Sequence, residues 1–432
     1  MTELAKLQSL RRAVHKQRAL AEDLFDSYRE ISKDVEGVTR PGWSEIEEAG
    51  AQLVADRAHE LGLEVEFDEL GQVYATLSGV DRPAPRIVIA SHLDSVQRGG
   101  NFDGYAGVVA GMTMLATLKA EGITPGCDVT VFGTRGEESV WYGIAYIGAR
   151  YSVGDLGWDE LSALVRADTG KSLPEHLGDL GYDVEAAKTH AGKARLTAQN
   201  TRAYFELHIE QGPLLDRDGV TAAVPTAIRG NARYPEITCT GRYGHASAEP
   251  LDDRRDAVLA VAELINRFDA FWKRQIAAGA PDTQLTVGRI HTDVNQDGLT
   301  VVPGECRLSF NFGGTTQEFI DAGKKHLAEL IKEIAVSRKV QFDVGRQVGS
   351  VPVPLNAGLR ETLLASAETL GISCREMATV GHDAAIYSKA GIPAAMILVR
   401  NQNGSHNPHE AMEIGDFLEG TAILTQAVLN TA

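Results

Sequence analysis

The 432-residue chain has few cysteines and no long hydrophobic run. Its four cysteines, at positions 127, 239, 306 and 374, are widely separated and form no Cys-x-x-Cys pair. A disulfide framework and a thiolate zinc site are therefore not expected, and buried small side chains in a reducing compartment are the simplest interpretation. No stretch of about 18 uninterrupted apolar residues occurs, so the sequence predicts no membrane span and no membrane partner.

Positive charge is also scarce. The chain has 42 Lys and Arg residues against 59 Asp and Glu, which gives a net charge of -17 at pH 7. A surface of that sign repels a phosphate backbone, so we expect no nucleic-acid partner. The first residues run straight into charged positions without the apolar core of a signal peptide, and a cytoplasmic protein is expected.

Two apolar segments are each followed by polar residues suited to metal binding. The segment 86–90 is typical of a buried strand and leads into His92. The segment 128–132 leads in the same way into Glu137 and Glu138. In open α/β sheets ligands bind beyond the carboxyl ends of the strands, where both groups would lie. This order predicts a two-metal hydrolase in which one carboxylate of the pair binds metal and the other transfers protons.

Two aspartates extend this group. Asp94 stands two residues after His92, a spacing that lets an acid orient an imidazole. Asp103 lies in the segment Gly-Gly-Asn-Phe-Asp-Gly, whose glycines permit close approach of the backbone. A carboxylate there can bridge two cations, and it can equally cap the helix expected from Gly104; the two roles are compatible.

His208 and His406 are the remaining candidate ligands. Spacing alone does not decide for either of them, and a strand with one wet face is the alternative for the segment around His208. His409 could compete with His406 for a metal, but the turn around Pro408 favours surface exposure of His409.

Hydrophobic periodicity divides the chain into three parts. In the first part we expect helices at 4–30, 44–61 and 104–120 and an edge strand at 63–67. The second part is a compact α+β unit with strands expected at 234–242, 285–290, 306–312 and 340–344 and helices at 252–278 and 316–338. In the third part we expect helices at 357–370 and 382–389 and a strand at 394–399.

These elements predict an α/β fold. Its catalytic domain is expected to be discontinuous, at residues 1–224 and 347–432, with a mixed, mainly parallel sheet flanked by helices. A smaller α+β domain at residues 225–346 is inserted into it.

The whole chain resembles a known family over about residues 35–425. It is similar to the hydantoinase/carbamoylase branch of the aminoacylase and carboxypeptidase G2 superfamily of two-metal amidohydrolases. This branch contains N-carbamoyl-L-amino-acid hydrolases, allantoate amidohydrolases and β-ureidopropionases. The phrase around His208 separates it from classical members of the superfamily, which have an acidic ligand at that step. The motifs that carry the resemblance are Gly37 to Arg40, Ser91 to Ser95, Gly99 to Gly104, Glu137-Glu138, His208 to Pro213, Gly381 to Ala384 and Ser405 to Pro408.

The resemblance implies two divalent metal ions per chain, either zinc or manganese, cobalt or nickel. Asp103 would bridge them, Glu137 would be the general base, and Asp94 would orient His92. It also implies that the inserted domain is a dimerisation or lid domain, which makes a homodimer or higher homo-oligomer, and that His245 reaches the partner's active site. The implied metal ligands are His92, Asp103, Glu138, His208 and His406.

The implied reaction is hydrolysis of a non-peptide carbon–nitrogen bond in a small, anionic substrate such as an N-carbamoyl (ureido) amino acid. A metal-bridged hydroxide, formed as Glu137 takes its proton, attacks the carbon. His245 contacts the substrate and stabilises the oxyanion, and Glu137 returns the proton to the departing nitrogen.

The usual carboxylate anchors of the branch are replaced in this chain. Relatives carry Asn before a Val-x-Pro-Gly turn and Arg thirteen residues later, where this chain has Thr300 and Gly313. Neither can replace the bidentate contact of an Arg fork. Arg400, six residues before His406, is a candidate for that role, with a surface salt bridge as the alternative. By analogy, the substrate pocket is also expected to include Gln211, His382 and Asn295.

Two further functions compete with this interpretation. An allantoate-type deiminase, or an aminohydrolase acting on an unusual amine such as an aromatic one, gains weight from the lost anchors. A catalytically silent scaffold is the non-enzymatic alternative. The intact set of charged residues argues against a scaffold, because burying such charges is costly unless they have a function.

Overall fold

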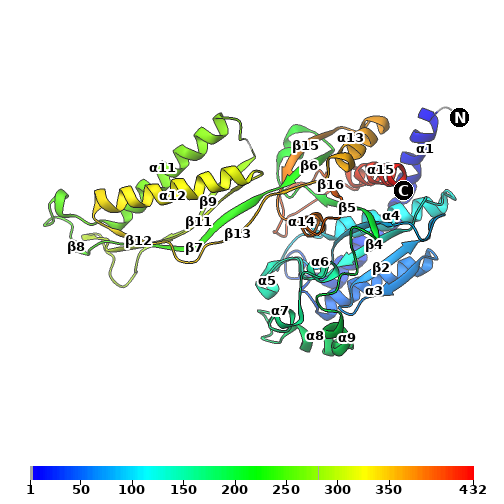
Figure 1. Cartoon of the computed structure of the whole chain (residues 1–432), viewed down its shortest axis with the longest axis horizontal. Coiled ribbons are helices and arrows are strands. Elements are labelled where there is room, and N and C mark those ends of the chain that lie inside the picture. Colours follow the sequence, from blue (N-terminus) through cyan, green and yellow to red (C-terminus); the bar gives the residue numbers. More distant parts are fainter. Residues whose placement is uncertain (1–2, 281) are drawn as a thin grey trace. The chain divides into compact units, whose positions relative to one another are not determined.

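The computed structural model describes residues 3–280 and 282–432. The described chain forms two compact units (Figure 1). Unit 1 extends to Thr226 and resumes at Leu355, and unit 2 comprises Ala227–Pro354. The inserted unit therefore continues eight residues beyond the expected end at 346. A lid or dimerisation role for it stays a prediction.

Unit 1 is built around a mixed sheet. Four neighbouring strands at its centre, β4, β3, β5 and β16, are parallel to one another. The pairs β1–β2, β2–β4 and β6–β16 are antiparallel. Strand β15 (Cys374–Thr379) pairs with β6 beside the main path. In spatial order the sheet contains β1 (Glu64–Phe67), β2 (Val73–Leu77), β4 (Val129–Thr134), β3 (Arg86–His92), β5 (Thr201–Ile209), β16 (Ala394–Val399), β6 (Ala222–Ile228) and β14 (Val353–Pro354).

The central strands are buried on both faces. Every residue of β4 and β16 is buried, and in β5 only Arg202 is exposed. Near-continuous apolar strands are typical of parallel sheets covered by helices on both sides. Helix α4 (Tyr105–Ala120) packs on β3, β4 and β5, and its residues from Tyr105 to Leu118 are all buried. The mixed α/β sheet expected from the sequence is therefore present.

Other helices surround this sheet (Figure 1). The longer ones are α1 (Glu3–Lys16), α2 (Arg18–Ser32), α3 (Glu45–Glu60), α13 (Ala357–Leu370) and α15 (Ile414–Thr431). The shorter ones are α5 (Ser139–Tyr142), α6 (Ile147–Ser152), α7 (Trp158–Ser162), α8 (Leu173–Asp179), α9 (Val184–His190), α10 (Leu214–Asp218) and α14 (Ala384–Lys389).

Among the expected elements that differ in the structure, the strand expected at 234–242 begins four residues earlier, at Gly230, and three helices have other limits. The helix predicted over 4–30 is two helices, α1 and α2, separated by a turn at Gln17; both contact α4 and α15, and α1 also packs on α13 whereas α2 packs on α3. The long helix predicted from 252 begins at Ala257, where Asp256 caps it by accepting from the Leu259 N–H. The helix predicted from 382 begins at Ala384, after His382 and Asp383.

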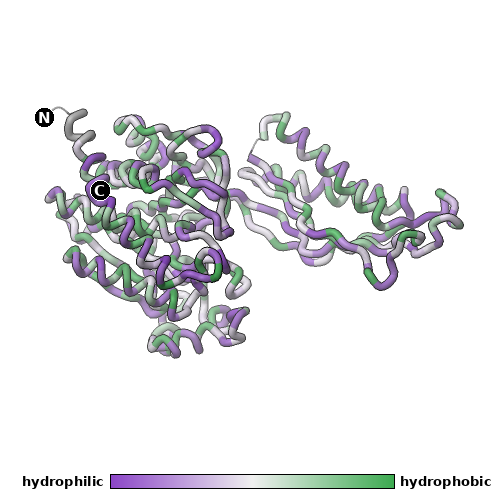
Figure 2. The backbone as a smooth tube through the Cα atoms, turned by 180° about the vertical axis from the view of Figure 1, so that it is seen from behind, coloured by the Kyte–Doolittle hydropathy of each residue, from purple (hydrophilic) through white to green (hydrophobic). Residues whose placement is uncertain are grey.

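Unit 2 is an antiparallel sheet with two long helices packed on it. The helices are α11 (Ala257–Ala277) and α12 (Gln317–Arg338), and both carry hydrophilic and hydrophobic residues along their length (Figure 2). Alternate residues of β11, from Cys306 to Phe312, are buried with them in one core. The sheet order is β12 (Gln341–Asp343), β7 (Gly230–Thr240), β11 (Glu305–Gly314) and β9 (Thr283–His291), with β13 (Val348–Ser350) paired to β7. A separate ribbon joins β8 (Gly244–His245) and β10 (Val301–Val302).

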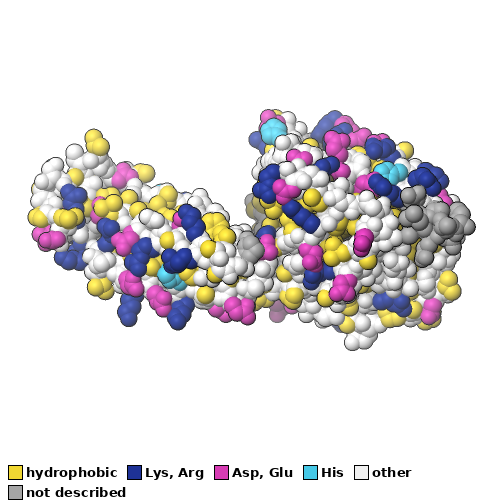
Figure 3. All heavy atoms as spheres, turned by 90° about the horizontal axis from the view of Figure 1, so that it is seen from above, with side chains coloured by type: hydrophobic (Ala, Val, Ile, Leu, Met, Phe, Trp, Pro, Cys, Tyr) yellow, Lys and Arg dark blue, Asp and Glu magenta, His cyan; other side chains and the backbone are white. Residues whose placement is uncertain are grey.

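Two further observations concern the charge of the surface and the hydropathy of the helices. On the face seen in Figure 3, acidic and basic side chains are intermixed, so the negative net charge is not gathered in one patch there. Across the described ranges, we find no helix that combines the length and hydropathy needed to cross a membrane.

Candidate metal centre

Histidine and carboxylate side chains meet at the carboxyl ends of the four parallel strands of unit 1. His92 is the last residue of β3, and Glu137 and Glu138 follow the end of β4. His208 lies one residue before the end of β5, and His406 follows β16 by seven residues. Neighbouring parallel strands end at the same edge of a sheet, which is why residues more than 300 positions apart converge here.

Asp103 is the centre of this cluster. It lies between β3 and α4, and its Oδ1 is 3.5 Å from His92 Nε2 and 3.2 Å from His208 Nε2. Its other oxygen, Oδ2, is 3.4 Å from His406 Nε2, which is 3.2 Å from Glu138 Oε1. Asp103 therefore belongs to two groups able to hold a metal ion, one with His92 and His208 and one with Glu138 and His406.

The spacing of these atoms fits metal ligands better than direct ion pairs. A charge-assisted N–H···O hydrogen bond has a donor–acceptor distance of about 2.7 to 2.9 Å. Two ligand atoms on a tetrahedral ion, each about 2.0 to 2.1 Å from it, are about 3.3 to 3.4 Å apart. The four distances of 3.2 to 3.5 Å match the second case. The residues present therefore suit two divalent cations that share Asp103.

Backbone carbonyls fix the orientation of two imidazoles. His92 Nδ1 is 3.0 Å from the carbonyl oxygen of Asp94, and His208 Nδ1 is 2.9 Å from that of Ile209. A carbonyl oxygen can only accept, so Nδ1 carries the hydrogen in both rings. When either ring is neutral, its lone pair is on Nε2, the atom that faces Asp103, as a metal ligand requires; His208 Nε2 also accepts the Gly104 N–H at 3.0 Å.

Asp94 contacts His92 through its main chain more closely than through its side chain. Its main-chain carbonyl, and not its carboxylate, makes the close contact with His92; the carboxylate oxygen Oδ1 is 3.5 Å away from the ring. The carboxylate instead accepts the main-chain N–H groups of Glu137 and Glu138, both at 3.0 Å. Asp94 is buried, and its side chain holds the acidic pair at the end of β4.

Glu137 lies beside the ligand groups without belonging to either of them. Its Oε2 is 3.9 Å from His92 Nε2. Burial raises the pKa of Glu137 well above the usual range of a carboxyl group; His92 opposes this change, and the neighbouring acids Glu138 and Asp383 add to it. A carboxyl group at this position can accept a proton near neutral pH.

Two predicted pocket residues also reach the cluster. Gln211 donates from Nε2 to Asp103 Oδ2 at 2.8 Å, and its φ of 64° places it in the left-handed region. The ring of His382 is 4.4 Å from that of His208, measured between centroids. Burial, together with the neighbouring His208, lowers the pKa of His382 well below its ordinary value. The neutral His382 ring shares a hydrogen bond with Thr379 Oγ1 at 2.9 Å.

A third group of potential ligands, Glu206 with His208 and His382, is less suited to a metal. Both oxygens of Glu206 already accept hydrogen bonds, Oε1 from Ser91 and Oε2 from Tyr204 and the Ala384 N–H. Glu206 and the nearby Asp383 are buried acids, and burial raises the pKa of Asp383 to about 7. Sequence reasoning gave neither acid a role, although Asp383 lies in the motif Gly381 to Ala384 and Glu206 is an acid within an apolar strand.

Arg400 makes the salt bridge that was the alternative to its predicted anion-binding role. Its guanidinium makes two hydrogen bonds to the carboxylate of Asp416, at 2.8 and 3.0 Å. Asp216 and Glu413 are nearby acids that, with this pair, raise the pKa of Arg400. Two donors of the guanidinium are therefore occupied by Asp416, and a role of Arg400 in anion binding stays a prediction. His409 is exposed, in agreement with the turn around Pro408.

The remaining predicted residues lie in unit 2. His245 is an exposed residue of β8, and Asn295 is held in a turn by hydrogen bonds to Asp293. Gly313 faces Asn231 across the β7–β11 ladder, and a Cβ atom at Gly313 would lie 2.2 Å from the Gly230 carbonyl oxygen. Unit 2 therefore leaves no room for a side chain at position 313, so the Arg that the resemblance leads one to expect there could not be accommodated without a backbone shift.

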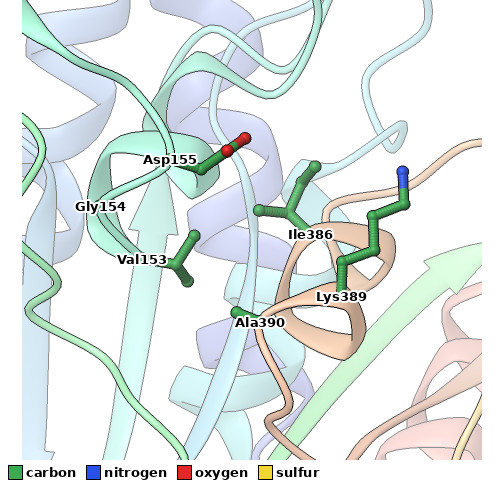
Figure 4. A pocket seen from close by; sticks show the side chains of 6 residues that line it. All are labelled: Val153, Gly154, Asp155, Ile386, Lys389 and Ala390. Carbon is green, nitrogen blue, oxygen red and sulfur yellow. The ribbon is translucent and has the colours of Figure 1, made fainter.

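A separate cavity in unit 1 lies apart from the residues of the candidate metal centre. It has a volume of about 330 Å³ and lies between the end of α6 and α14 (Figure 4). Asp155 and Lys389 contribute opposite charges to an otherwise apolar lining. None of its lining residues belongs to the histidine–carboxylate cluster.

Comparison with known proteins gives the same family as the motifs. A family model described as peptidase family M20/M25/M40 matches residues 88–430. The N-carbamoyl-L-amino-acid amidohydrolase of Pseudomonas sp. (strain NS671) is 28% identical over 395 residues, which is 91% of this chain and 93% of the relative. The allantoate amidohydrolase of Escherichia coli (strain K12) is 30% identical over 395 residues, 90% of this chain and 91% of the relative.

A solved structure agrees with these relatives. The hydantoinase/carbamoylase family amidase from Burkholderia multivorans has a TM-score of 0.85 and 27% identity, and the match covers 95% of this chain and 98% of that one. The resemblance inferred from the motifs is thereby confirmed, and the names of the relatives agree with the predicted enzyme class, a hydrolase of non-peptide carbon–nitrogen bonds. Because the family model matches most of its length, the chain belongs to peptidase family M20/M25/M40.

Proposed function

We propose that the chain is a metal-dependent amidohydrolase that cleaves a non-peptide carbon–nitrogen bond in a small, anionic N-carbamoyl (ureido) amino acid-like compound. The observation that carries the proposal is the sharing of Asp103 between two ligand groups with Glu137 beside them. Divalent cations held by His92, Asp103, Glu138, His208 and His406 would lower the pKa of a water between them and polarise the substrate carbonyl.

Glu137 is the proton carrier in this proposal. Its carboxylate takes a proton from the attacking water while the water oxygen bonds to the substrate carbon. The protonated Glu137 then gives this proton to the nitrogen as the carbon–nitrogen bond breaks. For a carbamoyl group the products are ammonia and a carbamate, which decomposes to the amine and carbon dioxide. Asp94 keeps Glu137 in place through its main-chain N–H.

Charged and polar groups around the cluster favour a small polar substrate. Gln211 presents an amide next to Asp103, and the neutral ring of His382 lies beside His208. Relatives named as N-carbamoyl-L-amino-acid amidohydrolases match more than 90% of this chain, which supports the carbamoyl amino acid as the first substrate class.

Allantoate is the second candidate substrate. Relatives named allantoate amidohydrolase, from Escherichia coli and Bacillus subtilis, are each 30% identical to this chain, at least as similar as the carbamoyl amino-acid relatives at 28 and 29%. Allantoate is also a small carboxylate with ureido groups, so the same cluster suits its hydrolysis.

An ammonia-release screen tests the proposal. The protein is loaded separately with zinc, manganese, cobalt or nickel and offered carbamoyl amino acids, allantoate, simple amides and aromatic amines. Ammonia released from a carbamoyl amino acid, and lost on chelation, supports the first candidate, whereas release from allantoate alone selects the second. Tight metal binding without release from any ureido compound would contradict the proposed reaction.

A further inference from the structure

The carboxylate of Glu410 lies directly against the segment that carries Asp103. Glu410 is 8% exposed and follows His406 by four residues. Its Oε1 accepts the main-chain N–H of Phe102 at 2.9 Å and that of Asp103 at 3.2 Å. Its Oε2 accepts the hydroxyl of Ser405 at 2.6 Å.

Ser405 joins the same two acids from the other side. Its hydroxyl also contacts Asp103 Oδ2, the oxygen that faces His406. Asp103 is therefore held at its main chain by Glu410 and at its carboxylate by Ser405 and Gln211. All of these partners come from segments more than 100 residues away in the sequence, so the backbone around Asp103 does not fix its position alone.

The close approach of Glu410 depends on a glycine. A Cβ atom at Gly100 would lie 2.1 Å from both Cδ and Oε1 of Glu410. Only glycine leaves room for the carboxylate at this distance from the main chain. The Gly-Gly-Asn-Phe-Asp-Gly segment is thus shaped to receive Glu410 as well as to present Asp103.

We infer that Glu410 is a positioning residue that sets the orientation of Asp103, so that one Asp103 oxygen faces each ligand group. Glu410 also lies in the loop that carries His406, so it fixes the bridging carboxylate and this loop relative to each other. Because the role presupposes the proposed metal centre, the test must distinguish failure of the centre from failure of the role. Partners that orient metal ligands commonly change metal affinity about 10- to 100-fold when they are removed.

The test compares three variants by titration with manganese or cobalt in competition with a chelator, together with the cobalt absorption spectrum. Glu410→Ala removes both acceptors, and we expect the weaker of two metal sites to lose affinity about 10- to 100-fold. Glu410→Gln keeps an oxygen for the two N–H groups and offers an amide N–H to Ser405. We therefore expect Glu410→Gln to restore affinity to within about three-fold of wild type, well short of the loss expected for Glu410→Ala.

Asp68 provides the matched control. It is also a buried acid that accepts two main-chain N–H groups, from Leu70 and Gln72, and it contacts no residue of the cluster. We expect Asp68→Ala to lower the melting temperature, as Glu410→Ala does, but to leave both metal affinities and the cobalt spectrum unchanged.

Each alternative result is decisive. Unchanged metal binding in Glu410→Ala, equal losses in Glu410→Ala and Asp68→Ala, or no rescue by Glu410→Gln would each overturn the positioning role. A wild-type chain that binds no divalent cation would instead contradict the proposed centre, and with it the role of Glu410.

Discussion

At the scale of single residues, Glu137 allows the most direct test, because its proposed function differs from that of its neighbour Glu138. Glu137→Gln removes the proton acceptor and leaves both ligand groups intact, since Glu137 belongs to neither. We expect turnover to fall by about two orders of magnitude or more, with metal content unchanged.

Steady-state kinetics and elemental analysis on the same preparation measure both quantities. Glu121→Gln is the control and should keep full activity. Glu121 lies at a partly exposed helix end and pairs with Lys16. Near-normal turnover of fully loaded Glu137→Gln would remove Glu137 from the proposed role.

Metal binding at His406 should release protons. The neighbouring carboxylates of Asp103 and Glu138 raise the pKa of His406 to about 11 in the metal-free chain, and the pKa values of His92 and His208 are also raised. A metal binds only the neutral ring, so at pH 7 to 8 the cation must displace these protons, and its affinity should rise with pH.

Isothermal titration in buffers of different ionisation enthalpy measures this release. The apparent binding enthalpy should change with the buffer in proportion to the protons released. An enthalpy independent of the buffer would show that the histidines are already neutral and would contradict this prediction.

Among the candidate ligands, His92, Asp103 and Glu138 could be picked out from the residues because they follow an apolar strand or lie in a glycine-rich loop, whereas His208 and His406 were named by the resemblance; the structure places all five in two groups that share Asp103. The contacts that orient these residues could not be predicted from the sequence. Whether His92 is oriented by the carbonyl or the carboxylate of Asp94 depends on local backbone direction. Arg400 was expected near the anion because it precedes His406, but Asp416, the third residue of α15, pairs with it. That helix was not anticipated from the sequence.

At the scale of elements, a buried ion pair joins α3 to the end of β4. Arg135 donates to Glu47 at 2.7 Å and to Glu48 at 2.9 Å, and both Arg135 and Glu47 are fully buried. Removing one partner of a buried pair commonly costs about 3 to 5 kcal/mol, because the other charge loses its compensation. We expect Arg135→Ala to destabilise unit 1 by that amount.

The same variant should show a defined pH dependence. Burial raises the pKa of Glu47 to about 7 even though Arg135 opposes the change, so without Arg135 the folded chain binds the Glu47 proton still more firmly. Stability then falls as pH rises from the unfolded value near 4.5 through the folded one. The loss caused by Arg135→Ala should therefore be smaller at pH 5 than at pH 8.

Urea denaturation followed by tryptophan fluorescence measures this loss, because Trp43 lies over Arg135. Arg150→Ala provides the comparison, since Arg150 pairs with Asp155 and Glu160 at the surface, where such a change costs about 1 kcal/mol or less. Equal losses of stability in the two variants would contradict the prediction that the buried Arg135 pair contributes more to stability than the surface pairs of Arg150.

Elements with a regular apolar pattern were predicted well, and short or interrupted ones were not. The buried runs of β3, β4 and β16 stood out in the sequence, as did α12, where 316–338 was expected and Gln317–Arg338 is observed. The break at Gln17 has no glycine or proline to announce it. Helices α1 and α2 both contact α4 and α15, and in addition α1 packs on α13 whereas α2 packs on α3, which is a property of the tertiary structure.

At the scale of the whole molecule, the inserted unit of the structure extends further along the chain than the residues 225–346 expected for the inserted domain. The structure begins unit 2 at Ala227, close to the expected 225, and ends it at Pro354. The additional residues form β13 and β14, which pair with β7 and β6. Two- or three-residue strands carry no periodicity of their own, so their place in a sheet is decided by the partner strand.

Assembly is the remaining whole-molecule question, and His245 offers a direct test. The sequence resemblance predicts a homodimer through unit 2 in which His245 of one chain acts in the active site of the other. Glu137→Gln and His245→Ala chains should then each be nearly inactive alone.

In a mixed dimer, one of the two sites receives an intact Glu137 from one chain and an intact His245 from its partner. After full subunit exchange of equal amounts, about a quarter of all sites in a two-fold symmetric dimer would be complete. We therefore expect activity to recover to about a quarter of the wild-type value on mixing, with size-exclusion chromatography confirming dimers throughout. If His245 acted within its own chain, or if the chains did not associate, every site in the mixture would lack one of the two residues and no recovery would occur.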